Sequence, residues 1–134
     1  MEYKVIKINN IEFAKQIKSL FKDLHWANGR TIKDIEHQIK NSINVGIAHN
    51  NELIAYARAI SDYKFISTIV DVVVKEQYRE KGFGKELLKE LIEHPKLKSV
   101  KQHELYCKNY NLKFYEKLGF KLKKDLNFMR LTKE

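Results

Sequence analysis

The sequence has only one cysteine, one proline and no long apolar run, and each scarcity excludes a class of protein. The single cysteine, Cys107, has no partner for an intrachain disulfide, which excludes a disulfide-stabilised scaffold. The longest apolar run is the five residues 53–57, whereas a membrane-spanning helix needs roughly 20 residues. One proline and five glycines, with 43% hydrophobic residues, exclude collagen-like and low-complexity chains. We therefore expect a globular chain without a membrane segment.

Targeting and metal-binding patterns are missing as well. No basic segment followed by an apolar stretch opens the sequence, so we expect a cytoplasmic location. The five histidines and Cys107 show neither C-x-x-C nor H-x-x-x-H spacing, so we expect no metal site. Cys107 is more typical of a small buried hydrophobe than of a nucleophile. A chain of 134 residues is long enough for one real core, and we expect residues 1–134 to form a single domain.

Positive charge is abundant and unevenly distributed. The net charge is +9, and residues 75–134 carry 16 Lys and Arg against 9 Asp and Glu, which is +7 of that total. Such an excess indicates attraction to a polyanion, either nucleic acid or a phosphorylated cofactor. The alternative is a solvated Lys-rich surface, because many lysines alternate with glutamates at helical spacing. Nucleic acid is the less favoured partner, because no strand interleaves aromatic and basic residues.

The hydrophobic periodicity predicts eleven elements in the order β-α-α-β-β-β-α-β-α-β-β. Helices are expected over 13–24, 31–42, 83–92 and 112–118, and strands over 3–8, 43–48, 53–60, 65–75, 105–107, 120–122 and 128–131. Asn50-Asn51 predicts a hairpin turn between the second and third strands. The nearly continuous apolar character of 65–75 favours a strand buried on both faces. The fold class is therefore α/β (α+β): a mixed sheet with helices on both faces.

The segment from Val72 to Lys85 carries the clearest chemical signal. It runs from the buried strand through a polar turn with Gly82 and Gly84 directly into a helix. The first N–H groups of a helix have no internal partner, and glycines let a phosphate approach the backbone. Arg79, Lys81 and Lys85 would add positive charge. The segment therefore predicts an anion site, although a tight strand-to-helix turn would use the same glycines.

Two better-known phosphate loops are excluded by spacing. A P-loop needs Ser or Thr after its lysine, but Glu86 follows Lys85, and no glycine precedes Gly84 by five residues. A dinucleotide-binding loop needs glycine at position 87, which is Leu87.

The spacing of Arg79, Gly82 and Gly84 instead resembles the Gln/Arg-x-x-Gly-x-Gly/Ala loop of the GNAT superfamily of N-acetyltransferases. A second motif of that family, Tyr-x-x-x-Gly-Phe, is matched downstream from Tyr115 to Phe120. The order of elements also resembles the fold of the family, so the resemblance covers nearly the whole chain, although the first third matches only in pattern. It implies a GNAT-like, mostly antiparallel mixed sheet that binds acetyl-CoA.

The resemblance also implies roles for particular residues. Val72, Val73 and Val74 would present backbone groups to the pantetheine arm, and the segment of Glu80, Lys81, Gly82, Phe83, Gly84 and Lys85 would hold the pyrophosphate, helped by Arg79. The strands ending near Val74 and Cys107 would splay, with Leu105 and Cys107 lining the cleft. Asn109 lies one position from an Asn that many members place seven residues before the Tyr, so an amide contact from it departs from the family pattern.

Acid and base candidates come from different arguments. The resemblance places Tyr115 where a phenol can protonate the departing CoA thiolate, although a tyrosine beside Phe114 and Phe120 could also be a core aromatic. Asp71, inside an apolar strand, is either a hydrogen-bonded structural carboxylate or a weak first choice as general base. His25 and Trp26 fall where family members place substrate-contacting loops, and a Trp at a helix end is also typical of a core.

The sequence thus predicts an enzyme that moves an acetyl group from acetyl-CoA to a primary amine of a small molecule or protein. A catalytically silent acyl-CoA-binding or sensing module is the alternative, because a fold can outlive its chemistry. The expected partners are acetyl-CoA and an unidentified amine, with no membrane and with a homodimer left open.

Overall fold

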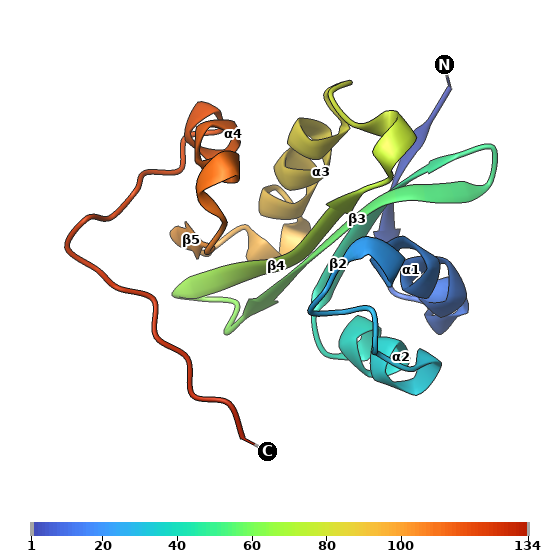
Figure 1. Cartoon of the computed structure of the whole chain (residues 1–134), viewed down its shortest axis with the longest axis horizontal. Helices are drawn as coiled ribbons and strands as arrows, with labels where there is room; N and C mark the ends of the chain where they lie inside the picture. Colours follow the sequence, from blue (N-terminus) through green and yellow to red (C-terminus); the bar gives the residue numbers. More distant parts are fainter. Residues whose placement is uncertain (1, 134) are drawn as a thin grey trace.

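A five-stranded sheet forms the centre of the computed structural model, which describes residues 2–133 (Figure 1). The strands lie side by side in sequence order: β1 (Lys4–Ile8), β2 (Ile43–His49), β3 (Glu52–Ser61), β4 (Ile66–Val74) and β5 (Gln102–Glu104). The first three pairings are antiparallel, and only β4 and β5 run parallel. The predicted mixed, mostly antiparallel sheet is confirmed.

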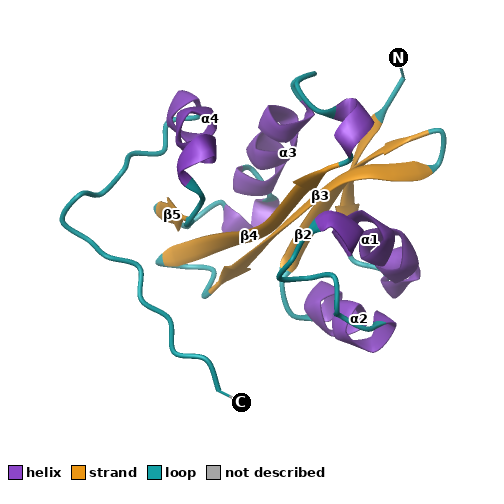
Figure 2. Cartoon of the chain, in the orientation of Figure 1, coloured by secondary structure: helices purple, strands orange, loops and turns teal. Residues whose placement is uncertain are grey.

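Helices cover both faces of this sheet (Figure 2). On one face lie α1 (Ala14–Leu20) and α2 (Ile32–Lys40), which pack against side chains of β3 and β4 such as Tyr56 and Val73. On the other face α3 (Phe83–Ile92) packs against β2 and β3, and α4 (Leu112–Lys117) stands beside it. Two apolar layers, one on each face, therefore hold the sheet.

Local signals in the sequence explain the boundaries of several elements. Thr31 and Asp34 form a capping box at the start of α2: the Thr31 hydroxyl accepts from the Asp34 N–H, and the Asp34 carboxylate accepts from the Thr31 N–H. In the β2–β3 turn, Asn50 and Asn51 have φ of 50° and 63°, a conformation that asparagine tolerates. The predicted hairpin turn is confirmed.

The core beneath α3 depends on three leucines at helical spacing. Leu87, Leu88 and Leu91 are all buried against β-strand residues. Each such side chain stabilises the fold by about 1.5–3 kcal/mol relative to exposure. This packing fixes the first turn of α3 at the carboxyl end of β4.

Strand predictions near the end of the chain were wrong. The fifth strand is Gln102–Glu104 and not 105–107, because parallel pairing with Ile66–Thr68 selects the segment just before the expected apolar run. Neither 120–122 nor 128–131 is a strand, and the described chain after α4 runs extended along the outside (Figure 1). Without a cross-strand partner, β-prone residues such as Phe128 and Leu131 do not form a ladder.

Strand β4 also differs from the prediction in its burial. Buried and half-buried side chains alternate along it, so only one row of its residues is fully enclosed. No helix within residues 2–133 has the length and apolar character needed to span a membrane.

Candidate active site

The candidate site is the place where β4 and β5 separate. Their parallel pairing covers Ile66–Thr68 and Gln102–Glu104, whereas β4 continues to Val74. The outer edge of β4 after Thr68 therefore has no strand partner within residues 2–133. The Lys75 N–H donates to the Ile54 carbonyl of β3 at 2.8 Å, so strand alternation turns the Val74 N–H and the Val72 C=O toward this open edge.

A β-bulge interrupts β4 beside this opening. Tyr56 pairs with Val73 and Arg58 pairs with Val70, which leaves Asp71 and Val72 together opposite the single residue Ala57. Asp71 has a positive φ of 55°, an unusual conformation for a residue other than glycine. Neighbouring structure must hold such a conformation in place, and it marks a functional candidate.

Two arginines and a tryptophan hold the Asp71 carboxylate. Its oxygens accept hydrogen bonds from Arg30 Nη1 at 2.7 Å, Arg58 Nε at 2.6 Å and Trp26 Nε1 at 3.2 Å. Burial raises the pKa of the Asp71 carboxyl, but hydrogen bonds and positive charge from the two arginines outweigh it, so the pKa lies below its usual value. The carboxylate is therefore ionised at neutral pH, and its lone pairs are engaged by donors.

Tyr115 packs on the α3 side of the sheet, against the core cluster that contains Leu87 and Leu88. The ring is partly buried and makes edge contacts with Phe114 and Phe120, at centroid distances of 5.0 and 5.9 Å. Burial, with a smaller contribution from nearby Cys107, raises the pKa of Tyr115 to about 12. No hydrogen bond within the described chain engages the hydroxyl, so Tyr115 is a protonated and available donor at neutral pH.

The glycine loop begins at the carboxyl end of β4 and leads into α3. Gly82 caps α3 with φ of 87°, and Glu80 before it also has a positive φ of 60°. The first helical hydrogen bond is from the Glu86 N–H to the Gly82 carbonyl, so the N–H groups of Phe83, Gly84 and Lys85 have no partner inside the helix. These groups make the loop competent to hold an anion.

Side chains of the loop have different environments. Lys81 and Lys85 are exposed, whereas Phe83 is buried against Tyr3 and Tyr78. The Arg79 Nε donates to the Val74 carbonyl at 2.9 Å, which ties this residue to the end of β4.

Gly84 serves the packing of α3 against α4. A Cβ at this position would approach the Phe114 ring to 3.0 Å, while one at Gly82 would meet nothing within 4 Å. Glycine is therefore required at the two positions for different reasons: close packing at Gly84 and a left-handed backbone at Gly82.

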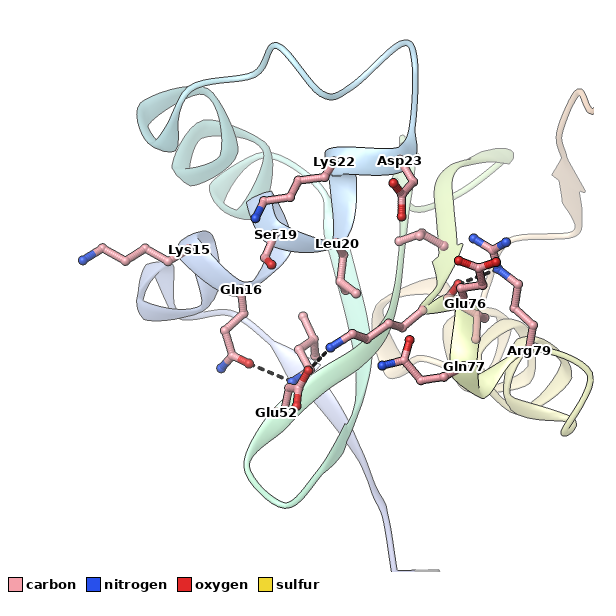
Figure 3. Close-up of a pocket in the computed structure, with 14 residues that line it drawn as sticks. Lys15, Gln16, Ser19, Leu20, Lys22, Asp23, Glu52, Glu76, Gln77 and Arg79 are labelled. Atoms are coloured by element: carbon pink, nitrogen blue, oxygen red, sulfur yellow. Dashed lines mark hydrogen bonds and ion pairs between the residues drawn. The ribbon is translucent and has the colours of Figure 1, made fainter.

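A cavity of about 500 Å³ lies on the α1 side of the end of β4 (Figure 3). Val73 and Leu53 line it from the sheet, Lys22 and Asp23 from the turn after α1, and Arg79 from the glycine loop. In Figure 3, Lys22 and Asp23 lie on one side of the cavity, and Gln77 and Arg79 lie on another. The cavity therefore borders the strand and loop predicted to hold the cofactor.

The structure brings some predicted site residues together and leaves others apart. Trp26 joins the Asp71 cluster although its side chain is 62% exposed. His25 is exposed, and no hydrogen bond engages its side chain within residues 2–133. Asn109 is exposed at the start of a short turn before α4. The substrate role of His25 and the cofactor role of Asn109 stay predictions.

Sequence reasoning missed Arg30 and Arg58. Arg58 interrupts an apolar strand, two residues after Tyr56 and so on the same face of the sheet, and Asp71 interrupts the next strand. Two opposite charges inside neighbouring strands could have indicated a buried ion pair. No group of three or more His, Cys, Asp or Glu that could bind a metal is found in the described part of the chain.

Comparisons with known proteins agree with this architecture. The family model described as the acetyltransferase (GNAT) family matches residues 9–120. An uncharacterized N-acetyltransferase of Pyropia yezoensis, ycf52, is 30% identical over 110 residues, which are 78% of this chain and 63% of that protein. The chain thus spans less than two thirds of this relative's length.

Solved structures share the fold over the whole chain. A GNAT-family protein of Xanthomonas campestris superposes with a TM-score of 0.83 at 24% identity, covering 98% of this chain and 94% of that one. Glucosamine-6-phosphate N-acetyltransferase of Arabidopsis thaliana gives 0.79 at 21% identity, covering 100% and 99%. Since the family model covers most of its length, the chain belongs to the GNAT family of acetyltransferases.

Proposed function

We propose that the protein transfers an acetyl group from acetyl-CoA to a primary amine of a small molecule or protein. The observation that carries this proposal is the early end of the β4–β5 pairing at Thr68 and Glu104, which leaves a strand edge open. Tyr115 packs against the same apolar core cluster as Val72 and Val74 of this strand. An extended pantetheine arm adds to such an edge as a further strand would. Family membership supports acetyl-CoA as the donor.

The cofactor is proposed to bind along the end of β4 and at the start of α3. The Val72 C=O and the Val74 N–H face the open edge and match the amide groups of pantetheine in type. The unpaired N–H groups at Gly84 and Lys85 would receive the pyrophosphate, with Lys81 and Lys85 contributing positive charge. Phe83 contributes its backbone, because its side chain is part of the core.

The proposed reaction is direct attack by the neutral amine on the thioester carbonyl. A C–N bond forms, the C–S bond breaks, and the CoA sulfur leaves as a thiolate. The Tyr115 hydroxyl is the proposed proton donor to that sulfur, a role that contributes roughly 10² to 10⁴-fold to rate. Its raised pKa supports this role, since the proton is present throughout the neutral range.

Asp71 fits a structural role better than that of a general base. Its lowered pKa and its bonds to Arg30 and Arg58 make the carboxylate a poor proton acceptor. We propose that Asp71 holds the bulge of β4 and that the amine loses its proton to water. Trp26, fixed by its bond to Asp71, and His25 are proposed to contact the acceptor.

A silent acyl-CoA-binding module is the second candidate, and the engagement of Asp71 by donors favours it because no general base is evident. An acetyl-CoA-dependent amine screen that follows thiol release separates the two. Thiol release with matching amine acetylation supports the enzyme, and CoA binding without turnover supports the module. The single domain, the cytoplasmic location and the open question of a homodimer stay predictions, tested by limited proteolysis, fractionation and light scattering.

A further inference from the structure

A second cavity, of about 480 Å³, lies between α2 and the end of β3 and is separate from the one beside the glycine loop. The cavity is lined by Arg30 before α2, by Asp34, His37, Gln38 and Asn41 of α2 and its C-cap, and by Arg58 and Ile60 of β3. No role predicted from the sequence uses this cavity. Its chemistry depends on which of these polar groups are already engaged.

Arg58 is held so that part of its guanidinium stays available. Its Nε donates to the Asp71 carboxylate at 2.6 Å, and only 15% of the side chain is exposed. Within residues 2–133, neither of its terminal nitrogens, Nη1 and Nη2, has a hydrogen-bond acceptor. A buried carboxylate thus orients a planar fork whose outer two nitrogens are free, the geometry that binds carboxylate or phosphate oxygens in pairs.

The other polar groups of the cavity have partners. Arg30 donates to both Gln38 and Asp71. The Asp34 carboxylate caps α2, where hydrogen bonds from Thr31 keep its pKa below the usual value. The Asn41 amide donates to the His37 carbonyl at 2.8 Å. In Arg58, by contrast, both terminal nitrogens lack an acceptor within residues 2–133.

The position of Arg58 connects the cavity to the site of chemistry. Arg58 pairs with Val70 on β4, directly before the bulge at Asp71, and β5 leaves β4 after Thr68. A molecule held by Arg58 would lie beside the start of the opening. Ile60, 49% exposed at the rim, offers an apolar contact for the carbon chain of such a molecule.

From these contacts we infer that the cavity binds an anionic group of the acceptor, so that the preferred substrates are amines that also carry a carboxylate or a phosphate. The inference rests on the proposed acetyltransferase function. It assigns Arg58 as a specificity-determining residue that pairs with the anion through Nη1 and Nη2.

The test compares matched amines that differ only in the anionic group. 5-Aminopentanoate is paired with pentylamine, and phosphoethanolamine with ethanolamine, so the two arms distinguish carboxylate from phosphate. We expect kcat/KM to favour at least one anionic member by about tenfold or more, the effect of a good charge-assisted pair. In Arg58→Gln that preference should fall to about twofold or less, mainly through a higher KM for the anionic amine.

The design includes controls for folding and for the proposed function. Lys98→Gln removes an exposed cation that lines neither cavity, and it should keep the wild-type preference. Arg58→Lys keeps the positive charge but not the planar fork, so it should also lose most of the preference for anionic amines. This variant serves as the test if Arg58→Gln does not fold. If the wild-type protein acetylates neutral and anionic amines equally, the inference is wrong and the proposed acetyltransferase function still holds. If it acetylates none of these amines, the proposed function is itself contradicted.

Discussion

Arg58 on β3 and Asp71 on β4 form an ion pair across two neighbouring strands, with Nε and Oδ2 2.6 Å apart and both side chains largely buried. The pair lies where β4 bulges and β5 departs. Arg30 closes the cluster from the α2 side, so three separate segments of the chain meet at one carboxylate. The cluster therefore links the helical layer to the strand on which the cofactor is proposed to lie.

Replacing Asp71 by Asn should destabilise the protein by about 3 kcal/mol at pH 7, because two partly buried arginines lose their counter-charge. The folded pKa of Asp71 is depressed, so its stabilisation is present above the unfolded pKa and is lost as pH falls through the folded pKa. Urea unfolding of both proteins at pH 7 and below pH 4 measures the loss of stability in Asp71→Asn and its dependence on pH. A difference between wild type and Asp71→Asn that stays constant over this range contradicts the role given to the cluster.

Removing the hydroxyl of Tyr115 tests the general acid. Tyr115→Phe keeps the ring contacts and should lower turnover by about 10-fold to 10³-fold, or roughly 1.4 to 4 kcal/mol, with the Kd of acetyl-CoA nearly unchanged. Turnover, CoA affinity and Tm are measured on one preparation. A core role alone would instead leave turnover per folded molecule at the wild-type level.

The pH profile gives an independent check on the same residue. Since the pKa of Tyr115 is raised to about 12, its proton is retained to pH 10, and kcat should not fall between pH 8 and 10. Deprotonation of the amine should raise the rate over the same interval. An alkaline decrease near pH 9 that persists in Tyr115→Phe would point to another group as the acid, and one that vanishes in this variant would contradict the raised pKa of Tyr115.

The glycine loop can be tested with two alanine substitutions. Gly82→Ala adds a Cβ at φ of 87°, beside the N–H groups proposed for the pyrophosphate, and should cost about 1 kcal/mol of stability through strain. The Tm increase produced by saturating CoA should also shrink. Gly29→Ala is the matched control, because its Cβ meets nothing within 4 Å and no positive φ is involved. An unchanged CoA effect in Gly82→Ala removes the loop from the cofactor site.

The sequence predicted most elements up to α4 because their signals are local. The Thr31 to Asp34 cap, the Asn50-Asn51 turn and the leucine spacing of α3 each depend on neighbours within a few residues. Strand β5 was misplaced because its residues, Gln102–Glu104, have weak β-propensity and are selected by pairing with β4. The strands predicted after α4 failed for the converse reason, since β-prone residues there lack a partner in the structure.

In the candidate site too, features that depend on neighbouring residues could be predicted, and those that depend on distant residues could not. The turn at Gly82 could be predicted because a strand, a glycine turn and a helix follow one another along the chain, and its anion-binding role stays a prediction. The environment of Asp71 could not be predicted, because Arg30 and Arg58 reach it from 41 and 13 residues away. A carboxylate in an apolar strand indicates that partners exist, but the fold alone decides which ones.

The central claim is acetyl transfer, and the most direct measurement follows CoA thiol release and the acetylated product together while a panel of primary amines is offered with acetyl-CoA. The account predicts equal amounts of free CoA and acetylated amine for at least one acceptor, with both reduced in Tyr115→Phe. Saturable CoA binding without product across neutral, cationic and anionic amines would contradict the claim and favour the silent acyl-CoA-binding module.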